Sequence, residues 1–394
     1  MLLNGMKIVS FCHFLQGPAA MQYLADMGAA LVKIEPPQGA FERDWSGADR
    51  AKVGGVSALY LCANRDARSL ALDLKHPEAK DVVFRLLEHS HVLAENYRPG
   101  AMERLGLGYE AVRARKPDII YASASGYGAA GPYSGRPGQD LVIQAMSGLA
   151  WSSGPAGSPV PAGSAVTDQH GAALLALGIV GAYARWLSTG AGTRVESTLL
   201  GAGVDLQTEA LVTYFAAGSH ADVERDPRLA TWFHEAPYGV YRIADGHVAL
   251  SLNPPARLAD ALGSEALRAF VGCNAYAERD AIAAAVAAEL QSRPFVELAA
   301  AFDAAGVWYA RVDDYDAVVR NPQIAHNETF RDVEINGAHV KVLRHPVRYD
   351  GRTPGDGRYA LAAGADTREV LGEAGFSDAE IAELLRDRIA FAAD

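Results

Sequence analysis

The sequence is poor in cysteine and lacks the segments that mark secreted or membrane-spanning proteins. Among 394 residues there are three cysteines, Cys12, Cys62 and Cys273, with no C-x-x-C pair. This spacing supports neither a disulfide framework nor a structural zinc site, and it fits a reducing compartment best. The apolar stretch 171–184 falls short of the ~20 residues of a membrane-spanning helix, and no signal-peptide pattern opens the chain. We therefore expect a cytoplasmic protein without a metal.

Basic residues are outnumbered by acidic ones. Lys and Arg total 36 against 47 Asp and Glu, which gives a formal net charge of −11. Phosphate binding needs a basic footprint, so this balance argues against a general partner role for nucleic acid or an anionic membrane. A local basic pocket is still compatible with it.

Common catalytic motifs are missing as well. The sequence has no Walker motif, no H-E-x-x-H and no Ser with Gly at both ±2 positions, which argues against the usual phosphate-loop, zincin and hydrolase interpretations. Residues 126–131 match G-x-G-x-x-G after a predicted strand. A dinucleotide-binding motif also opens a helix, whereas Pro132 and Pro137 keep this chain irregular. A glycine turn at a strand end is the simpler interpretation.

The first half of the chain alternates strand and helix patterns. Helical spacing at 18–27, after Pro77 and at 100–116 separates short apolar runs that predict strands at 6–12, 30–35, 69–74, 91–97 and 118–125. Such alternation indicates a mostly parallel sheet whose ligands lie beyond the carboxyl ends of its strands. We expect an α/β fold with a Rossmann-like large domain over 1–220.

The pattern changes near residue 221. Two alternating runs around an Asp-Gly turn at 238–252 predict a β-hairpin, and alanine-rich helices fill roughly 255–305. We expect a smaller α+β domain over 221–329. A C-terminal segment over 330–394 then ends in an amphipathic helix at 378–388.

Asp168 is an informative single residue because it stands at or near the start of a long apolar helix, 171–187. The plain structural interpretation is an N-cap, since Asp is favoured there and capping stabilises a helix by about 1 kcal/mol. The helix N-terminus would also keep a carboxylate ionised in apolar surroundings, as a carboxylate nucleophile requires. Both interpretations are open on this pattern alone.

Several cations and an amide follow the predicted strands. Lys75, Asn96, Arg98 and Arg104 stand at the carboxyl ends of parallel strands or in the helix turns after them. They form either a solvated rim or an anion pocket suited to phosphate groups.

Five blocks extend these observations over most of the chain. In order they are GPAAMQYLADMGAALVKIEPP, ENYRPGAMERLGLGYE, SASGYGAAGPYSGRPGQDLVIQAMSG, the TDQHGA segment and GADTREVLGEAGFSDAEIAELL. Together they resemble the class III CoA-transferase family, which includes formyl-CoA:oxalate and carnitine CoA-transferases and the α-methylacyl-CoA racemases.

The resemblance implies roles for particular residues. Asp168 stands at the position of the family's catalytic aspartate, and five residues stand where relatives contact CoA: Leu72, Lys75, Asn96, Tyr97 and Arg104. Relatives that use oxalate carry a glutamine in an early turn. Leu15 occupies that position here, and Gln16 follows it by one place. Gln139 replaces the catalytic histidine of the racemases and cannot act as a proton-transferring base. Gln16, Gly126 and Gln139 are candidate oxyanion or substrate contacts.

The resemblance also implies the reaction and the assembly. We expect transfer of coenzyme A from an acyl-CoA to a small carboxylic acid through an aspartyl-CoA thioester on Asp168, with CoA as a substrate and no permanently bound cofactor. We expect a homodimer of interlocked rings in which the final segment returns to the large domain. Two alternatives stay open: an acyl-CoA racemase pairing Asp168 with His170, and a noncatalytic CoA-binding module.

Overall fold

The computed structural model describes the 394 residues except 46, 48–49, 156, 219–222, 356 and 394. The chain forms two compact units, each assembled from separate stretches of sequence. Unit 1 comprises Met1–Ile143, Ala165–Gly203 and Pro322–Asp394, and unit 2 comprises Gln144–Ser164 and Val204–Asn321. Compared with the limits 1–220, 221–329 and 330–394 expected from the sequence, residues 144–164 and 204–220 group with unit 2. The chain re-enters unit 1 near residue 322.

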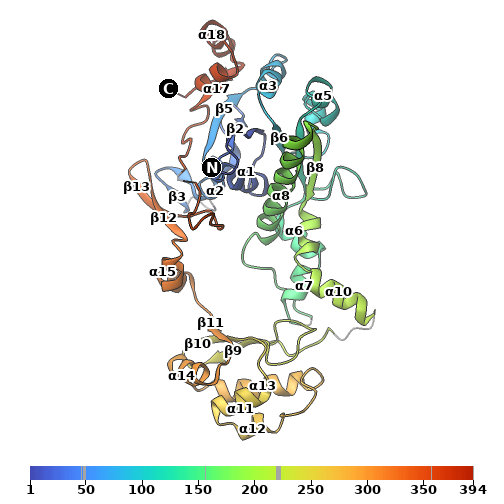
Figure 1. The fold of residues 1–394 in the computed structure, drawn as a ribbon, viewed down its shortest axis with the longest axis vertical. Coiled ribbons are helices and arrows are strands. Elements are labelled where there is room, and N and C mark those ends of the chain that lie inside the picture. The colour runs from blue at the N-terminus through green and yellow to red at the C-terminus, as the bar shows by residue number, and fades with distance from the viewer. Residues whose placement is uncertain (46, 48–49, 156, 219–222, 356, 394) are drawn as a thin grey trace. The chain divides into compact units, whose positions relative to one another are not determined.

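Unit 1 is built on a seven-stranded sheet with the order β14-β5-β2-β1-β6-β7-β8 (Figure 1). Its strands are β1 (Lys7–Ser10), β2 (Ala30–Glu35), β5 (Ala67–Leu72), β6 (Val92–Glu95), β7 (Ile120–Ser125), β8 (Thr193–Thr198) and β14 (Ala390–Phe391). Neighbouring strands run parallel except β14, which pairs antiparallel with β5. The predicted parallel α/β sheet is confirmed.

The strand order reverses between β1 and β6. From β1 the chain first adds β2 and β5 on one side and then crosses to β6, β7 and β8 on the other. In open α/β sheets, ligands bind at the carboxyl ends of the strands at such a switch point. The topology therefore directs attention to the residues immediately after β1 and β6.

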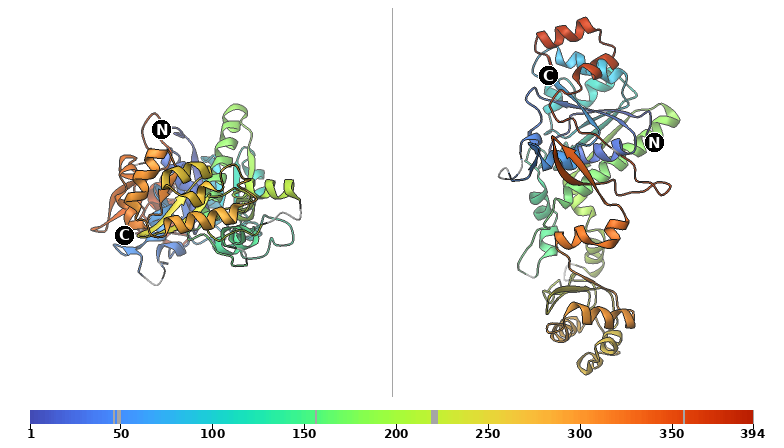
Figure 2. Two further views of the ribbon diagram at one scale, coloured as in Figure 1. Left: turned by 90° about the horizontal axis from the view of Figure 1, so that it is seen from below. Right: turned by 90° about the vertical axis from the view of Figure 1, so that its left-hand side faces the viewer.

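Helices cover both faces of this sheet. On one face α1 (Gln16–Asp26) and α8 (Val166–Thr189) pack on Ile8, Leu31 and Val92. The other face carries α3 (Ala79–Glu88), α4 (Ala101–Arg104), α5 (Tyr109–Arg115), α17 (Thr367–Glu373) and α18 (Asp378–Arg386). Figure 2 shows α17 and α18, in red, beside α3, in light blue. The C-terminal segment thus completes the core of unit 1.

Helix α8 is longer than the apolar run that predicted it. It starts at Val166, and by length and composition alone it could cross a membrane. Its side chains Ala172, Leu175 and Ile179 are instead buried in the core of unit 1. Burial explains the apolar character of these side chains, although only 39% of the most apolar stretch of the helix is buried.

The predicted helix over 100–116 is two helices, α4 and α5. Gly106 between them has a φ of +71°, which a right-handed helix cannot include. The unassigned stretch before β5 contains η1 (Phe41–Arg43), β3 (Lys52–Val53), β4 (Val56–Ser57) and α2 (Ala58–Ala63).

Unit 2 holds the predicted hairpin. Strands β9 (Gly239–Ile243) and β10 (Gly246–Leu250) pair antiparallel, with Tyr241 opposite Val248, and β11 (Tyr309–Arg311) joins β10. Its helices include α7 (Leu149–Ser153), α10 (Thr208–Ala217), α11 (Pro255–Leu262), α12 (Glu265–Arg268), α13 (Arg279–Leu290), α14 (Phe295–Ala305) and α15 (Tyr315–Arg320). Helices α6 (Asp140–Met146) and α9 (Leu199–Asp205) cross between the units. The return to unit 1 contains α16 (Pro322–His326) and the hairpin β12 (Phe330–Ile335) with β13 (Ala338–Leu343).

Candidate active site

The loops after β1 and β6 are joined by a reciprocal pair of hydrogen bonds. The backbone N–H of His13 donates to Asn96 Oδ1 at 2.9 Å, and Asn96 Nδ2 donates to the carbonyl of His13 at 2.7 Å. The ring of Tyr97 lies 5.1 Å from that of His13. Two predicted CoA contacts, Asn96 and Tyr97, therefore lie at the switch point of the sheet. Burial lowers the pKa of His13, so its ring is neutral near pH 7.

Gln16 begins α1 directly beside α8. Its side chain is buried, and among the described residues its Nε2 has no hydrogen-bond partner. A Cβ built at Gly171 would lie 2.6 Å from this Nε2, so only a glycine leaves room for the amide. Gly171 is three residues after Asp168 and shares its helix face. An unpaired buried donor is costly, and one placed here is available to a ligand oxygen.

Asp168 is the third residue of α8, and the N-cap interpretation is wrong. The N-cap is Ala165, which makes no side-chain capping bond. The role of cap is taken by a carboxylate from another element, Asp140 at the start of α6. Its Oδ1 accepts from the backbone N–H of Thr167 at 2.8 Å, from Thr167 Oγ1 at 2.7 Å and from the N–H of Asp168 at 3.3 Å.

The electrostatic expectation for Asp168 is also corrected. Burial, and after it the charge of Asp140, raise the pKa of Asp168 to about 7 from an ordinary 3.8. The helix N-terminus does not overcome these effects, because Asp140 already occupies it. Asp168 is consequently a carboxyl group that changes protonation state close to neutral pH.

Sequence reasoning named Gln139 and missed its neighbour Asp140. The side chain of Gln139 is exposed, and its carbonyl accepts from the N–H of Ile143 at 3.0 Å. Asp140 could have been noticed only as an acidic residue opening a helix pattern, since its contact with Thr167 spans 27 residues.

The glycine turn after β7 packs tightly on itself. A Cβ at Gly126 would lie 2.8 Å from the Cα of Gly138, so two backbone segments meet without side chains between them. The carbonyl of Gly126 accepts from the N–H of Leu200 at 3.0 Å. No helix follows until α6 begins at Asp140, which confirms that 126–131 is not a dinucleotide-binding motif.

The remaining predicted CoA contacts are placed in different surroundings. Leu72 is fully buried at the end of β5, where it pairs with Ala390. Lys75 and Arg104 are exposed. Tyr97 lines a cavity of about 110 Å³ that also contacts Arg98 and Gly128. Neither Lys75 nor Arg104 lines this cavity.

A series of exposed aromatic rings, which the sequence analysis did not single out, continues from His13. Phe14 lies 5.3 Å from both His13 and Phe41, and Phe41 lies 6.0 Å from Trp45. Phe14 has a φ of +61°, a strained value for a bulky residue. Phe14, Phe41 and Trp45 are 42%, 54% and 51% exposed. We call these three rings the aromatic wall.

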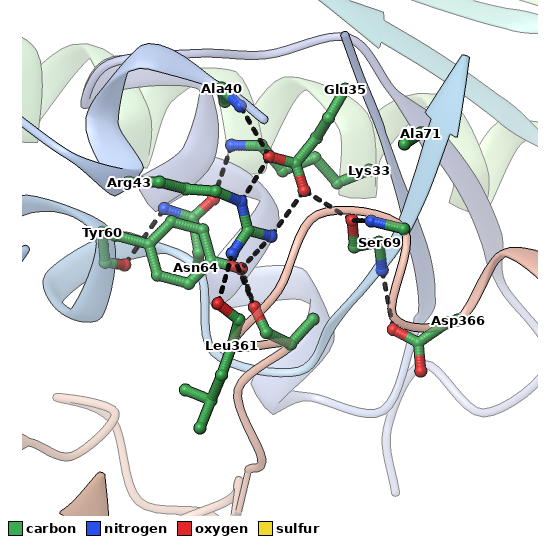
Figure 3. Close-up of polar contacts among 12 residues, drawn as sticks. Lys33, Glu35, Ala40, Arg43, Tyr60, Asn64, Ser69, Ala71, Leu361 and Asp366 are labelled. Atoms are coloured by element: carbon green, nitrogen blue, oxygen red, sulfur yellow. Dashed lines mark hydrogen bonds and ion pairs between the residues drawn. The ribbon is translucent and has the colours of Figure 1, made fainter. Parts of the chain in front are cut away.

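A buried polar network joins Arg43, the last residue of η1, to Glu35, the last residue of β2 (Figure 3). Arg43 donates to both carboxylate oxygens of Glu35, at 2.7 and 2.6 Å, and to Tyr60 Oη at 2.9 Å. It also donates to the carbonyl of Ala360 at 2.8 Å, from the C-terminal segment. Beside it, Lys33 Nζ donates to Glu42 at 2.5 Å and to Asn64 at 2.7 Å. The network joins three stretches that are distant along the chain, at residues 33–43, 60–64 and 360.

Within the described residues no three His, Cys, Asp or Glu side chains group closely enough to hold a metal ion. The candidate site is thus made of a carboxyl group, amides, backbone N–H groups and aromatic rings.

Comparison with known proteins identifies what such a chain is similar to. The profile of CoA-transferase family III matches residues 3–367. An acyl-CoA transferase of Fusarium pseudograminearum is 30% identical, over 98% of this chain and 88% of that protein. The human succinyl-CoA:glutarate CoA-transferase is 29% identical, over 97% of this chain and 88% of that protein.

A solved structure of this family is also similar in fold. The crystal structure of a CAIB/BAIF family protein from Brucella suis superposes with a TM-score of 0.81 at 26% identity. The superposition covers 94% of this chain and 99% of the other.

Proposed function

The chain belongs to CoA-transferase family III and is a CoA-transferase, and from this premise we propose that it moves coenzyme A from an acyl-CoA to a free carboxylic acid through a covalent intermediate on Asp168. The observation that carries the proposal is the position of Asp168. It is a half-buried carboxyl group with a raised pKa, one helical turn from the unpaired amide facing Gly171.

In the first half-reaction the Asp168 carboxylate attacks the acyl carbonyl of the donor. The carbon–sulfur bond breaks, which leaves a mixed anhydride on Asp168 and a CoA thiolate. The thiolate then attacks the aspartyl carbonyl of the anhydride, and the donor acid leaves as a carboxylate. The product is an aspartyl-CoA thioester, so one slow exchange is divided into faster steps.

The second half-reaction repeats these steps in reverse. The acceptor carboxylate attacks the aspartyl thioester, giving a new mixed anhydride and the thiolate. Attack of the thiolate on the acceptor's carbonyl forms the new acyl-CoA and returns Asp168 as a carboxylate. No net proton transfer and no oxidant or reductant is needed.

The environment of Asp168 suits a nucleophile. A carboxylate of higher pKa is a stronger nucleophile than an ordinary aspartate. Above pH 7, Asp168 is ionised in most molecules. Each carbonyl attack develops negative charge on oxygen. Gln16 Nε2, which has no partner in the described part of the chain, is the proposed donor to that oxygen, with backbone N–H groups near Gly126.

Lys75, Asn96, Tyr97 and Arg104 are the proposed CoA contacts, with the exposed cations Lys75 and Arg104 on its phosphate groups. The names of the relatives favour dicarboxylic acids as substrates. They include succinyl-CoA:glutarate, acetyl-CoA:oxalate and succinyl-CoA:mesaconate CoA-transferases. A small dicarboxylate acceptor is therefore the proposed substrate class.

A transfer assay tests the proposal directly. The protein is incubated with succinyl-CoA or acetyl-CoA and a pool of isotope-labelled mono- and dicarboxylic acids, and new thioesters are identified by mass spectrometry. The proposal expects labelled acid to appear as its CoA thioester with equimolar loss of the donor. Deuterium exchange at the α-carbon of an acyl-CoA without transfer would instead indicate a racemase.

A further inference from the structure

A second cavity lies in unit 1, beside α1. Its volume is about 370 Å³, and it is bounded by α1, α2 and residues 340–346 of β13 and the chain after it. Figure 1 shows these elements near one another, and α2 contacts both α1 and β13. Gln169, the residue after Asp168, also lines it. None of the residues given a role in the proposed transfer reaction lines this cavity.

The charge of the lining is unusual for an acidic protein. Three cationic side chains, Arg65, Lys341 and Arg344, line the cavity, and no Asp or Glu of the described chain does. Their acidic partners lie outside the lining: Asp26 pairs with Arg65, Asp332 with Lys341 and Glu328 with Arg344. In a chain of net charge −11, the lining therefore holds the cationic partners of three ion pairs and none of their acidic partners.

Two buried nitrogens of lining residues make no hydrogen bond within the described part of the chain. Arg344 donates through Nη1 to Glu328 at 2.6 Å, but its Nε is buried and finds no acceptor among the described residues. His345 is 6% exposed, and its Nδ1 lies 3.4 Å from Asp26 Oδ2 without a hydrogen bond. Buried polar atoms are nearly always satisfied, so the unpaired Nε of Arg344, a donor on a lining residue, points to a ligand with an acceptor oxygen.

The neutral part of the lining favours an organic anion over a bare phosphate. Ala58 and Leu61 are apolar lining residues, and Tyr23, which also lines the cavity, donates through its hydroxyl to Gln169 Oε1 at 3.5 Å. An apolar wall with a few convergent polar groups is typical of small-molecule sites, and 370 Å³ is within their usual size.

We infer that this cavity binds a small organic dicarboxylate at a site separate from the Asp168 carboxyl group, with Arg344 as its principal cation. The choice of ligand class rests on the proposed function, whereas the anion site itself rests on the lining. One carboxylate of the ligand pairs with Arg344, and its carbon chain lies along Ala58 and Leu61.

Isothermal titration calorimetry with glutarate tests this inference on the full-length protein, without acyl-CoA. Wild type should bind glutarate saturably and more tightly than inorganic phosphate. Arg344→Gln should weaken binding by about tenfold or more, because a charge-assisted hydrogen bond is lost. Glu328→Gln breaks the same ion pair but keeps the cation, so it should bind at least as tightly as wild type. Lys341→Gln serves as a second lining variant if Arg344→Gln lowers the thermal transition.

Asp168→Asn separates the inference from the proposed function. We expect this variant to lose CoA transfer and to bind glutarate like wild type. Glutarate binding that is lost in Asp168→Asn and unchanged in Arg344→Gln would overturn the second site and leave the transfer mechanism intact. Equal or tighter binding of phosphate would overturn the assignment to a dicarboxylate.

Discussion

At the scale of single residues, the contact between Asp140 and the start of α8 determines the chemistry of Asp168. Asp140 Oδ1 accepts from both Thr167 donors and from the N–H of Asp168, so it positions the helix start while its charge opposes ionisation of Asp168. Asp140 is therefore a positioning residue with an electrostatic effect. The two effects are separable, since Asn can accept the same hydrogen bonds without the charge.

This predicts a change in pH dependence. In wild type, kcat/KM should rise with pH through about 7 as Asp168 ionises. In Asp140→Asn the removal of one negative charge lowers the pKa of Asp168, so the rise should move to lower pH. Rates measured across the pH range check this, with Asp378→Asn, in the first turn of α18, as the control. An unchanged profile in Asp140→Asn would show that Asp140 does not act on the Asp168 charge.

The proposed phosphate contacts make a second residue-level prediction. Lys75→Ala and Arg104→Ala should raise KM for acyl-CoA with little change in kcat, because phosphate is bound equally in the ground and transition states. Steady-state kinetics measure this, and Lys80→Ala, an exposed lysine on α3, is the matched control. A loss confined to kcat would argue against a phosphate-binding role.

Among the elements, the helices and strands of the large sheet were easier to predict from the sequence than the segments that connect them. Strand β2 is expected at 30–35 and is found at Ala30–Glu35, because its β-branched and apolar residues are bounded by Gly28 and by two prolines. The stretch between β2 and β5 could not be assigned. Its structure depends on Arg43 reaching Glu35, Tyr60 and Ala360, and no local periodicity reports a contact across 317 residues.

The Glu35–Arg43 pair makes an element-level prediction about stability. Glu35→Gln would leave the Arg43 guanidinium buried without its charge partner and should lower the free energy of unfolding by about 3–5 kcal/mol. Glu373→Gln, which breaks the exposed pair of Glu373 and Arg68, should cost less than about 1 kcal/mol. Urea unfolding followed by circular dichroism compares the two variants. Equal losses would mean that the buried network does not hold η1 in place.

At the scale of the whole molecule, the sequence predicted the sheet but not how the chain contributes to it. The C-terminal segment supplies β14 and the side chains Val370 and Leu371 to the core of unit 1. The two-residue β14 is too short for any pattern. Asp168, Asn96 and Tyr97 could be proposed as site residues from a helix start, a strand end and the family blocks. Asp140 and the aromatic wall could not, because they depend on tertiary contacts.

Exposed apolar side chains bear on the expected homodimer. Large apolar side chains are exposed on two helices, with Leu177 and Leu187 of α8 at 67% and 65% and Phe215 of α10 at 74%. Exposed apolar surface of this kind supports a proposal that a second copy covers it. Sedimentation velocity should show a dimer that persists at nanomolar concentration, since interlocked rings cannot separate without partial unfolding. A monomer under those conditions would contradict it.

The nucleophilic role of Asp168 can be tested by trapping the covalent intermediate in wild type and in Asp168→Asn. Asn keeps the size of the side chain but lacks the anionic oxygen that forms the anhydride, so turnover should fall by several orders of magnitude. Incubated with acyl-CoA and hydroxylamine, wild type should gain a hydroxamate at residue 168, identified by peptide mass spectrometry, and the variant should gain none. Near-wild-type transfer by Asp168→Asn free of deamidation, or no hydroxamate on active wild type, would contradict the covalent mechanism.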